Sequence, residues 1–230
     1  MTKIFCDIAE IKLIKKFNKK NIVKGFTTNP SLMRKAGAKD YSKYCKSILR
    51  ITKKPISFEV FADDNKNIIK QALKIKDWGK QIYVKVPVTN SKGVFLGKVI
   101  SKLNKENIKL NITAVYTAKQ TGRILKRINK KTKVIISIFA GRMADKGIDP
   151  LPEFKKSIIF AKKYKNVSIL WASVREPYNY IQAKQLRCHI ITIPPQIIEK
   201  IEKFGKSFQA LTTDTVKAFL EDSKKSKFKI

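Results

Sequence analysis

Histidine and cysteine are scarce in this chain, and their scarcity narrows the chemistry that it can support. It has one histidine, His189, and three cysteines, Cys6, Cys45 and Cys188. The cysteines form no CxxC or other paired spacing, so the sequence favours free thiols in a reducing compartment over a disulfide framework or a zinc site. Since the only histidine begins a strand, we expect neither a His-based catalytic triad nor a metal site.

Long apolar runs and glycine-rich phosphate loops are also missing. No segment reaches the ~18 apolar residues of a membrane-spanning helix, and the start, MTKIFCDIAE, lacks the long apolar core of a signal peptide. The stretch GVFLGK has the wrong pattern for a P-loop. We therefore expect a cytoplasmic protein that has no membrane partner.

Acidic residues are few against a large excess of basic ones. The chain has 51 lysines and arginines but 17 aspartates and glutamates, a net charge of +34. Nucleic-acid binding is one interpretation of such a charge. The other is the codon bias of an AT-rich genome, since the lysines scatter over helical patterns without an arginine-rich stripe. We expect nucleic acid not to be the main partner, although a basic surface would concentrate small anionic substrates.

Short apolar runs rich in β-branched residues alternate with helical patterns along the whole chain. The expected strands cover residues 3–9, 23–28, 55–62, 82–89, 109–117, 133–142, 168–174 and 189–195. Repeated strand–helix units of this kind predict an α/β fold, a single-domain (β/α)8 TIM barrel over 1–206. An extra C-terminal helix and basic tail follow at 207–230. An open doubly wound sheet is the alternative, but its usual glycine-rich turn after the first strand is missing.

Polar residues interrupt the apolar strands, and Lys85 is the clearest case. It lies within IYVKVPVT, where a charged side chain is costly unless something requires it. Other polar residues stand near the carboxyl ends of further strands with matching parity, where the active site of such a barrel is built. They are Asp7, Thr27, Asn29, Glu59, Asn111, Thr113, Ser137, Arg142, Ser173 and Arg175. The pattern predicts one site at that end of the barrel.

Seven motifs carry a family resemblance. GFTTNPSL, SFEV, YVKVPVT, NITAVYTAKQ, ISIFAGR, WASVREP and ITIPP occur in this order. Together they resemble the transaldolase family, and in particular its short branch, which includes fructose-6-phosphate aldolase. The resemblance extends from about residue 4 to 198. It implies a (β/α)8 barrel that works with no metal and no cofactor.

The resemblance also implies a role for each predicted site residue. Lys85 would form a Schiff base with a ketose phosphate, because burial disfavours a charged amine and the neutral amine is the nucleophile. Asp7 would be the general base, and Glu59 the acid, acting through a water held with Thr113. The remaining residues would bind substrate: Thr27, Asn29, Asn111, Ser137 and Phe139 the sugar, and Arg142, Ser173 and Arg175 the phosphate.

Simpler structural roles remain open for several of these residues. Lys85 could extend its ammonium group out of the barrel mouth. Arg142 and Arg175 could form surface salt bridges, and Thr27 could cap the turn into NPSL. After the arginine of strand six, RMADKG offers Asp145 where members often have two acidic residues.

Three functions follow as hypotheses. The first is a transaldolase of the pentose phosphate pathway, which moves dihydroxyacetone between sugar phosphates. The second is a fructose-6-phosphate aldolase that releases dihydroxyacetone; Phe139 favours the first, since relatives with aldolase activity have tyrosine there. The third is a basic barrel without catalysis that binds RNA or a protein. Short relatives form rings, so we expect a homo-oligomer in which the apolar stripe of the last helix packs on a neighbour, or else on its own barrel.

Overall fold

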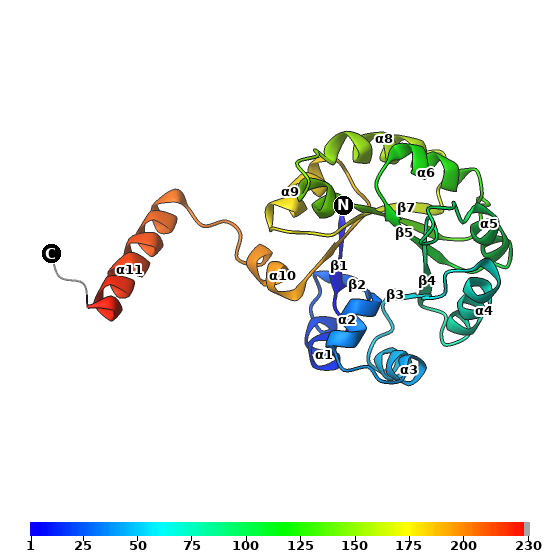
Figure 1. Ribbon diagram of the computed structural model, residues 1–230. Helices are drawn as coiled ribbons and strands as arrows, with labels where there is room; N and C mark the ends of the chain where they lie inside the picture. The colour runs from blue at the N-terminus through cyan, green and yellow to red at the C-terminus, as the bar shows by residue number, and fades with distance from the viewer. Residues whose placement is uncertain (228–230) are drawn as a thin grey trace.

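The computed structural model describes residues 1–227 and shows a closed barrel of eight parallel strands surrounded by helices (Figure 1). The strands are β1 (Lys3–Asp7), β2 (Val23–Thr27), β3 (Ile56–Glu59), β4 (Ile82–Pro87), β5 (Leu110–Val115), β6 (Val134–Phe139), β7 (Val167–Ala172) and β8 (Ile190–Ile193). They pair in chain order, and β8 closes onto β1. The predicted (β/α)8 TIM barrel is confirmed, and the doubly wound alternative is wrong.

Helices follow the strands; those before β8 connect successive strands on the outside of the barrel, and the last two come after β8. The helices are α1 (Ile11–Asn18), α2 (Pro30–Lys35), α3 (Tyr41–Ile51), α4 (Asn65–Lys76), α5 (Gly97–Lys105), α6 (Ala118–Leu125), α7 (Ala140–Ala144), α8 (Leu151–Ala161), α9 (Tyr178–Gln185), α10 (Pro195–Ile201) and α11 (Phe208–Ser226). Several begin at a residue whose side chain accepts a hydrogen bond from a free backbone N–H, such as Asp40, Asp64 and Thr117. These caps explain why the helices start where they do.

The predicted strand at 133–142 is too long, and the correction affects Arg142. Strand β6 ends at Phe139, and the short helix α7 begins at once, so Arg142 lies on a helix. Helix α7 comes very close to the chain after β7: a Cβ atom on Gly141 would lie 1.8 Å from the backbone oxygen of Ser173. Only glycine permits this approach without a shift of the backbone.

Apolar residues form two layers on the two faces of the barrel wall. The large core lies between strands and helices and includes Phe26, Phe58 and Trp171. A smaller cluster fills the inside of the barrel, with Phe5, Ile135, Leu170, Ala172 and Ile190 buried and Tyr83 and Phe139 packed against them. Because successive residues of a strand face opposite sides, β1, β4, β6, β7 and β8 contribute to both layers.

Helix α11 stands apart from the barrel, joined to α10 by an extended segment (Figure 1). None of its residues is buried, and its apolar side chains are exposed, with Phe208 at 90% and Phe219 at 69% exposure. The alternative in which this helix packs on its own barrel is therefore wrong. The end of the predicted tail, residues 228–230, lies outside the described residues.

Across the described residues, 1–227, every helix is too short or too polar to cross a membrane.

Candidate active site

A cavity of about 210 Å³ opens at the carboxyl ends of the strands. All the predicted site residues except Glu59 line it, and Ala172 and Thr192 complete the wall. They come from strands β1, β2, β4, β5, β6, β7 and β8 and from the loops that follow. The barrel thus brings together residues that are as far apart in the chain as Asp7 and Arg175, as the strand parity predicted, and adds Thr192.

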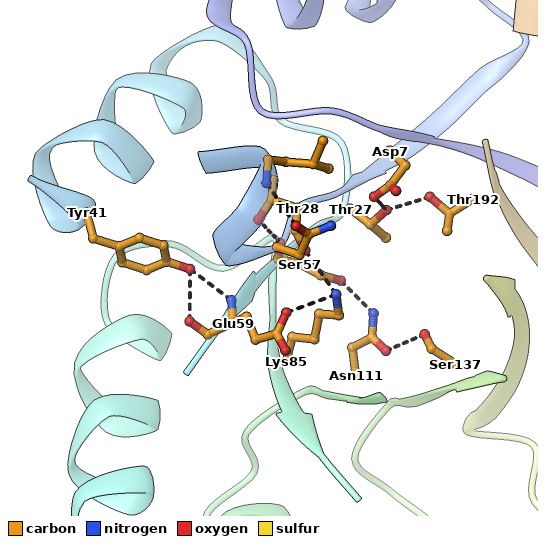
Figure 2. A network of polar contacts seen from close by, with 12 residues as sticks. Asp7, Thr27, Thr28, Tyr41, Ser57, Glu59, Lys85, Asn111, Ser137 and Thr192 are labelled. Atoms are coloured by element: carbon orange, nitrogen blue, oxygen red, sulfur yellow. Dashed lines mark hydrogen bonds and ion pairs between the residues drawn. The ribbon is translucent and has the colours of Figure 1, made fainter. Parts of the chain in front are cut away.

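Lys85 reaches into the barrel and is tied to two partners (Figure 2). It is 7% exposed. Its Nζ lies 3.1 Å from Oε2 of Glu59 and donates a 3.1 Å hydrogen bond to the backbone oxygen of Thr28. The alternative in which this side chain extends out of the barrel mouth is wrong. Attraction to a carboxylate at this distance offsets part of the cost of burying the ammonium group.

Glu59 lies behind Lys85, and its backbone is held from outside the barrel. The hydroxyl of Tyr41 donates to the Glu59 backbone oxygen and accepts from the Glu59 N–H, both at 2.9 Å. Strand β3 pairs with β2 only through Ile56 and Ser57, so the phenol substitutes for a neighbouring strand at Glu59. Burial raises the pKa of Tyr41, which keeps the hydroxyl protonated for this double contact.

Asp7 lines the cavity and belongs to a chain of hydroxyls that is separate from the pair of Lys85 and Glu59 (Figure 2). Thr27 donates a 2.7 Å hydrogen bond to Oδ1 of Asp7, and its Oγ1 lies 2.5 Å from Oγ1 of Thr192. Loss of water raises the pKa of Asp7, while Lys85 and the Thr27 hydroxyl oppose this with smaller effects. A carboxyl with a raised pKa is suited to accept a proton.

The predicted capping role belongs to Asn29 instead of Thr27. The Oδ1 atom of Asn29 accepts a 2.9 Å hydrogen bond from the Leu32 N–H, and α2 starts at Pro30. Asn29 also lines the cavity. The interpretation of Thr27 as a cap is wrong, because its hydroxyl points to Asp7.

Asn111 crosses the floor of the cavity between two serines. Its Oδ1 accepts from Ser137 at 2.6 Å, and its Nδ2 donates to Ser57 at 3.0 Å. Nearby, the hydroxyl of Thr113 is buried and has no hydrogen-bond partner among the described residues. An unpaired buried hydroxyl is costly, so Thr113 is a site where a ligand group would gain a hydrogen bond.

The two arginines stand at the rim of the cavity. Both Nε and Nη2 of Arg175 bind Asp145, the shortest contact being 2.5 Å, and this pairing holds the pKa of Asp145 below its usual range. The guanidinium carbon of Arg142 lies 5.2 Å from the centre of the Phe139 ring. Arg175 therefore makes the surface salt bridge that the sequence left open, while it also lines the cavity.

Ser173 has a backbone conformation that non-glycine residues rarely adopt, with φ of 64°. It follows the end of β7 and turns the chain so that Arg175 also faces the cavity. Residues held in such conformations often occur at functional sites, where the surrounding packing maintains them. Gly141, packed on the Ser173 carbonyl, supplies that packing here.

Several contributors to the site were not predicted from the sequence. They are Ser57, Thr192, Tyr41, Asp145 and the carbonyl group of Thr28. Thr192 has the same signal as the predicted residues, a polar side chain within an apolar strand, and parity could have found it. The others act through contacts that only folding creates. His189 lies elsewhere, and its Nδ1 accepts a hydrogen bond from the Ile169 N–H.

Within residues 1–227, no group of three His, Cys, Asp or Glu side chains is placed to hold a metal ion.

The family model and the similar proteins that we compared with this chain all indicate the same family. The model of the family described as transaldolase/fructose-6-phosphate aldolase matches residues 4–230. A protein named "probable transaldolase" from Thermoanaerobacter sp. is 33% identical over 229 residues, which are 99% of this chain and 100% of that protein. Similar proteins of the same name occur in Methanococcus vannielii, 34% identical over 96% of each chain, and in Thermoplasma volcanium, 35% identical over 97% and 96%.

The raised pKa of Asp7 predicts that this carboxyl destabilises the fold near neutral pH. Its contribution to stability is present below the ordinary pKa of 3.8 and is lost as pH rises through the raised value. Asp7→Asn should therefore raise the thermal midpoint at pH 7 by roughly 2–4 °C, about 1 kcal/mol in a chain of this length. The gain should vanish at pH 3, as measured by circular dichroism melts.

Asp63 serves as the control for Asp7, because its pKa is shifted in the opposite direction and its replacement should change stability in the opposite direction. Hydrogen bonds from Ser91 lower the pKa of this exposed carboxyl, so it contributes stability at pH 7 that is lost as pH falls. Asp63→Asn should lower the midpoint at pH 7. An Asp7→Asn variant that melts lower than wild type at pH 7 would contradict the assignment.

Proposed function

The chain belongs to the transaldolase/fructose-6-phosphate aldolase family, and we propose that it transfers a dihydroxyacetone unit between sugar phosphates through a Schiff base on Lys85. The observation that carries the proposal is the position of this amine. It is buried, it lines the cavity, and it has a carboxylate in contact on one side and Asp7 across the cavity on the other. The barrel surroundings thus provide a nucleophile and two separate acid–base groups.

The first step requires a neutral amine, and Glu59 is placed to produce it. With Oε2 of Glu59 3.1 Å from Nζ, the carboxylate can accept a proton directly from the ammonium group. The freed amine attacks the C2 carbonyl carbon of the ketose phosphate. The attacking nitrogen gives up one proton to the former carbonyl oxygen, and protonated Glu59 supplies a second. The oxygen then leaves as water, the iminium ion forms, and Glu59 is a carboxylate again. This direct contact differs from the water-mediated role expected for Glu59.

Bond cleavage follows at the opposite wall. Asp7 takes the proton of the C4 hydroxyl, the C3–C4 bond breaks, and its electron pair moves into the iminium to form an enamine on Lys85. The aldose phosphate leaves, and an acceptor aldehyde takes its place. The enamine carbon attacks the acceptor carbonyl, Asp7 returns the proton to the new hydroxyl, and hydrolysis of the iminium releases the product. One carboxyl thus acts as base and then as acid.

Polar groups of the wall would orient the sugar and its phosphate. Asn29, Asn111 and Ser137 offer donors and acceptors beside Lys85. The phosphate would lie at a rim that carries two cations, Arg142 and Arg175, and the hydroxyl of Ser173. Asp145 holds Arg175 in position but also lowers its net attraction for an anion. We propose that this pairing makes Arg142 the stronger phosphate contact.

The Schiff base can be trapped chemically. Borohydride added with fructose 6-phosphate should reduce the iminium and attach the sugar to Lys85, as read by mass spectrometry of the digested protein. Lys85→Ala should abolish both the adduct and activity. Glu59→Gln should slow adduct formation by about 100-fold, the usual size of a lost acid–base group. Persistent labelling of another lysine in Lys85→Ala would refute the assignment.

Phe139 favours transfer over simple aldol cleavage. Its ring lines the cavity, packs edge-to-face with Tyr116 at 5.9 Å, and carries no hydroxyl to help protonate the enamine. Release of free dihydroxyacetone needs that protonation, whereas transfer to an aldehyde does not. The second candidate, a fructose-6-phosphate aldolase, is in the same family description and differs at this step.

We expect wild-type turnover of fructose 6-phosphate to require an acceptor such as erythrose 4-phosphate. Phe139→Tyr should raise acceptor-independent release of dihydroxyacetone by at least about tenfold, ~1.4 kcal/mol in barrier. Product analysis with and without acceptor measures both. The matched control is Tyr116→Phe, which removes the hydroxyl beside the ring instead of adding one and should leave release unchanged. Brisk cleavage by wild type without acceptor would favour the aldolase.

The exposed α11 points to assembly. Its large apolar side chains are Phe208, Leu211, Val216, Phe219 and Leu220, and three pairs of them (208/211, 216/219 and 216/220) lie three or four residues apart, as on one side of a helix. An amphipathic helix that buries none of these residues in its own chain gains stability by packing on another subunit. We propose that residues 1–206 form the catalytic barrel in the reducing cytoplasm, as its buried free thiols suggest, and that residues 207–230 join the barrels into a homo-oligomer.

Light scattering after size exclusion tests this assembly. Wild type should be an oligomer at micromolar concentration, and Phe219→Ser/Leu220→Ser should shift it toward the monomer mass. Lys217→Gln/Lys224→Gln, on the same helix, should leave the mass unchanged. A monomeric wild type at this concentration would remove the oligomer from the proposal.

A further inference from the structure

A second and larger cavity opens at the amino-terminal ends of the strands, opposite the candidate active site. Its volume is about 1080 Å³. Residues at the starts of β1, β2, β6, β7 and β8 line it, together with the loops that precede them. A concave site of this size is large enough for one drug-sized ligand. None of the residues that line the active-site cavity lines this one.

The inner wall of this cavity is apolar and aromatic. Phe5, Tyr83, Ile135 and Ile190 line it, and they belong to the cluster that fills the inside of the barrel. Tyr83 is partly exposed, and loss of water raises the pKa of its phenol, so it presents a neutral ring. Phe5, Ile135 and Ile190 are 2–5% exposed, so the Tyr83 ring is the part of this wall that a flat, uncharged group would contact.

The rim of the cavity is strongly basic. Met1, which carries the amino terminus, lines it too, and its charged side chains are all lysines: Lys3, Lys24, Lys130, Lys131, Lys133 and Lys165. No acidic residue lines the cavity, and in the described part of the chain none of these six lysines takes part in a salt bridge. The positive charge here is thus not neutralised by the protein itself.

Hydrogen bonds hold part of this basic rim in a defined arrangement. The Nδ2 atom of Asn166 donates to the backbone oxygens of Asn129 and Thr132, at 2.9 and 2.6 Å. These bonds tie the loop before β7, which carries Lys165, to the loop before β6, which carries Lys133. The lysines of the two loops therefore stand on a fixed backbone.

Neighbouring groups at this end of the barrel show the effect of the accumulated charge. Burial and then Lys133 lower the pKa of Lys109, and burial and then Lys24 lower that of Lys54. Burial, Lys3 and the amino terminus lower the pKa of His189. A bound anion would relieve this repulsion, because it would place negative charge among like cations.

We propose that this cavity binds a nucleoside polyphosphate. The lysines of the rim bind the phosphates as point charges, and the base lies against the partly exposed Tyr83 ring. Neither half of such a ligand alone satisfies the cavity, since an inorganic anion leaves the apolar wall in water and an uncharged nucleoside leaves the lysines unpaired. Sugar phosphates have no apolar surface to match the wall. The site is independent of the proposed transaldolase reaction.

Calorimetric titration of the full chain at about 150 mM salt tests the two-part recognition. ATP is the probe, with adenosine and tripolyphosphate as its separate halves. ATP should bind at least about tenfold more tightly than either half, since each half makes only part of the contacts. Tripolyphosphate binding as tight as ATP binding would overturn the proposal, because general attraction of polyanions to a basic protein would then suffice.

Variants locate the site. Lys133→Glu/Lys165→Glu should weaken ATP binding at least about tenfold, while the matched pair Lys70→Glu/Lys74→Glu, exposed on α4, should leave it within about twofold. Tyr83→Leu, which keeps the wall apolar, should weaken ATP but not tripolyphosphate. Equal losses in both lysine pairs, or loss of ATP binding in Arg175→Ala at the opposite end of the barrel, would overturn the proposal.

Discussion

The buried ion pair between Lys85 and Glu59 constrains the rest of the barrel interior. A lone ammonium or carboxylate inside a protein costs several kcal/mol, and removal of one partner from a buried pair costs about 3–5 kcal/mol. The pair therefore requires support: the Thr28 carbonyl accepts from Nζ, and the Tyr41 hydroxyl fixes the backbone of Glu59. Strand register places the two charges side by side, since Glu59 and Lys85 are direct partners in the β3–β4 ladder. The pair is possible only because the barrel closes around it.

The charged groups of the site belong to two systems that do not merge. Lys85 and Glu59 form one, and Asp7, Thr27 and Thr192 form the other. Only the longer-range attraction of Lys85 connects them, and burial outweighs that attraction at Asp7. One carboxylate is thus held in an ion pair while the other has a raised pKa. Such a separation lets two groups of the same chemical type take different parts in one reaction.

The barrel interior also divides the molecule along its axis. The apolar cluster of Phe5, Ile135, Leu170 and Ile190 lies between the polar cavity at one end and the basic cavity at the other. Gly25 makes room for it, because a Cβ atom there would lie 2.6 Å from the Phe5 ring. The chemical character of the side chains therefore changes along the barrel axis. Lysines lie at the amino-terminal mouth, apolar side chains in the middle, and acid–base groups at the carboxyl end.

Local patterns in the sequence determined the strands, their parity and most of the residues that line the candidate active site; Thr192 was missed. Apolar residues recur with a period of two in strands and 3.6 in helices. These periods involve residues that are close together in the sequence, so they can be recognised without the fold. Lys85 could be singled out in the same way, because its apolar neighbours in IYVKVPVT identify it as a charged residue within a strand. Only the tertiary structure decided which groups touch: Thr27 meets Thr192 across 165 positions, and Arg175 meets Asp145 across 30. Barrel closure and loop packing create such pairs, as they create the basic cavity and the isolation of α11. They depend on distances in space, which no local spacing encodes.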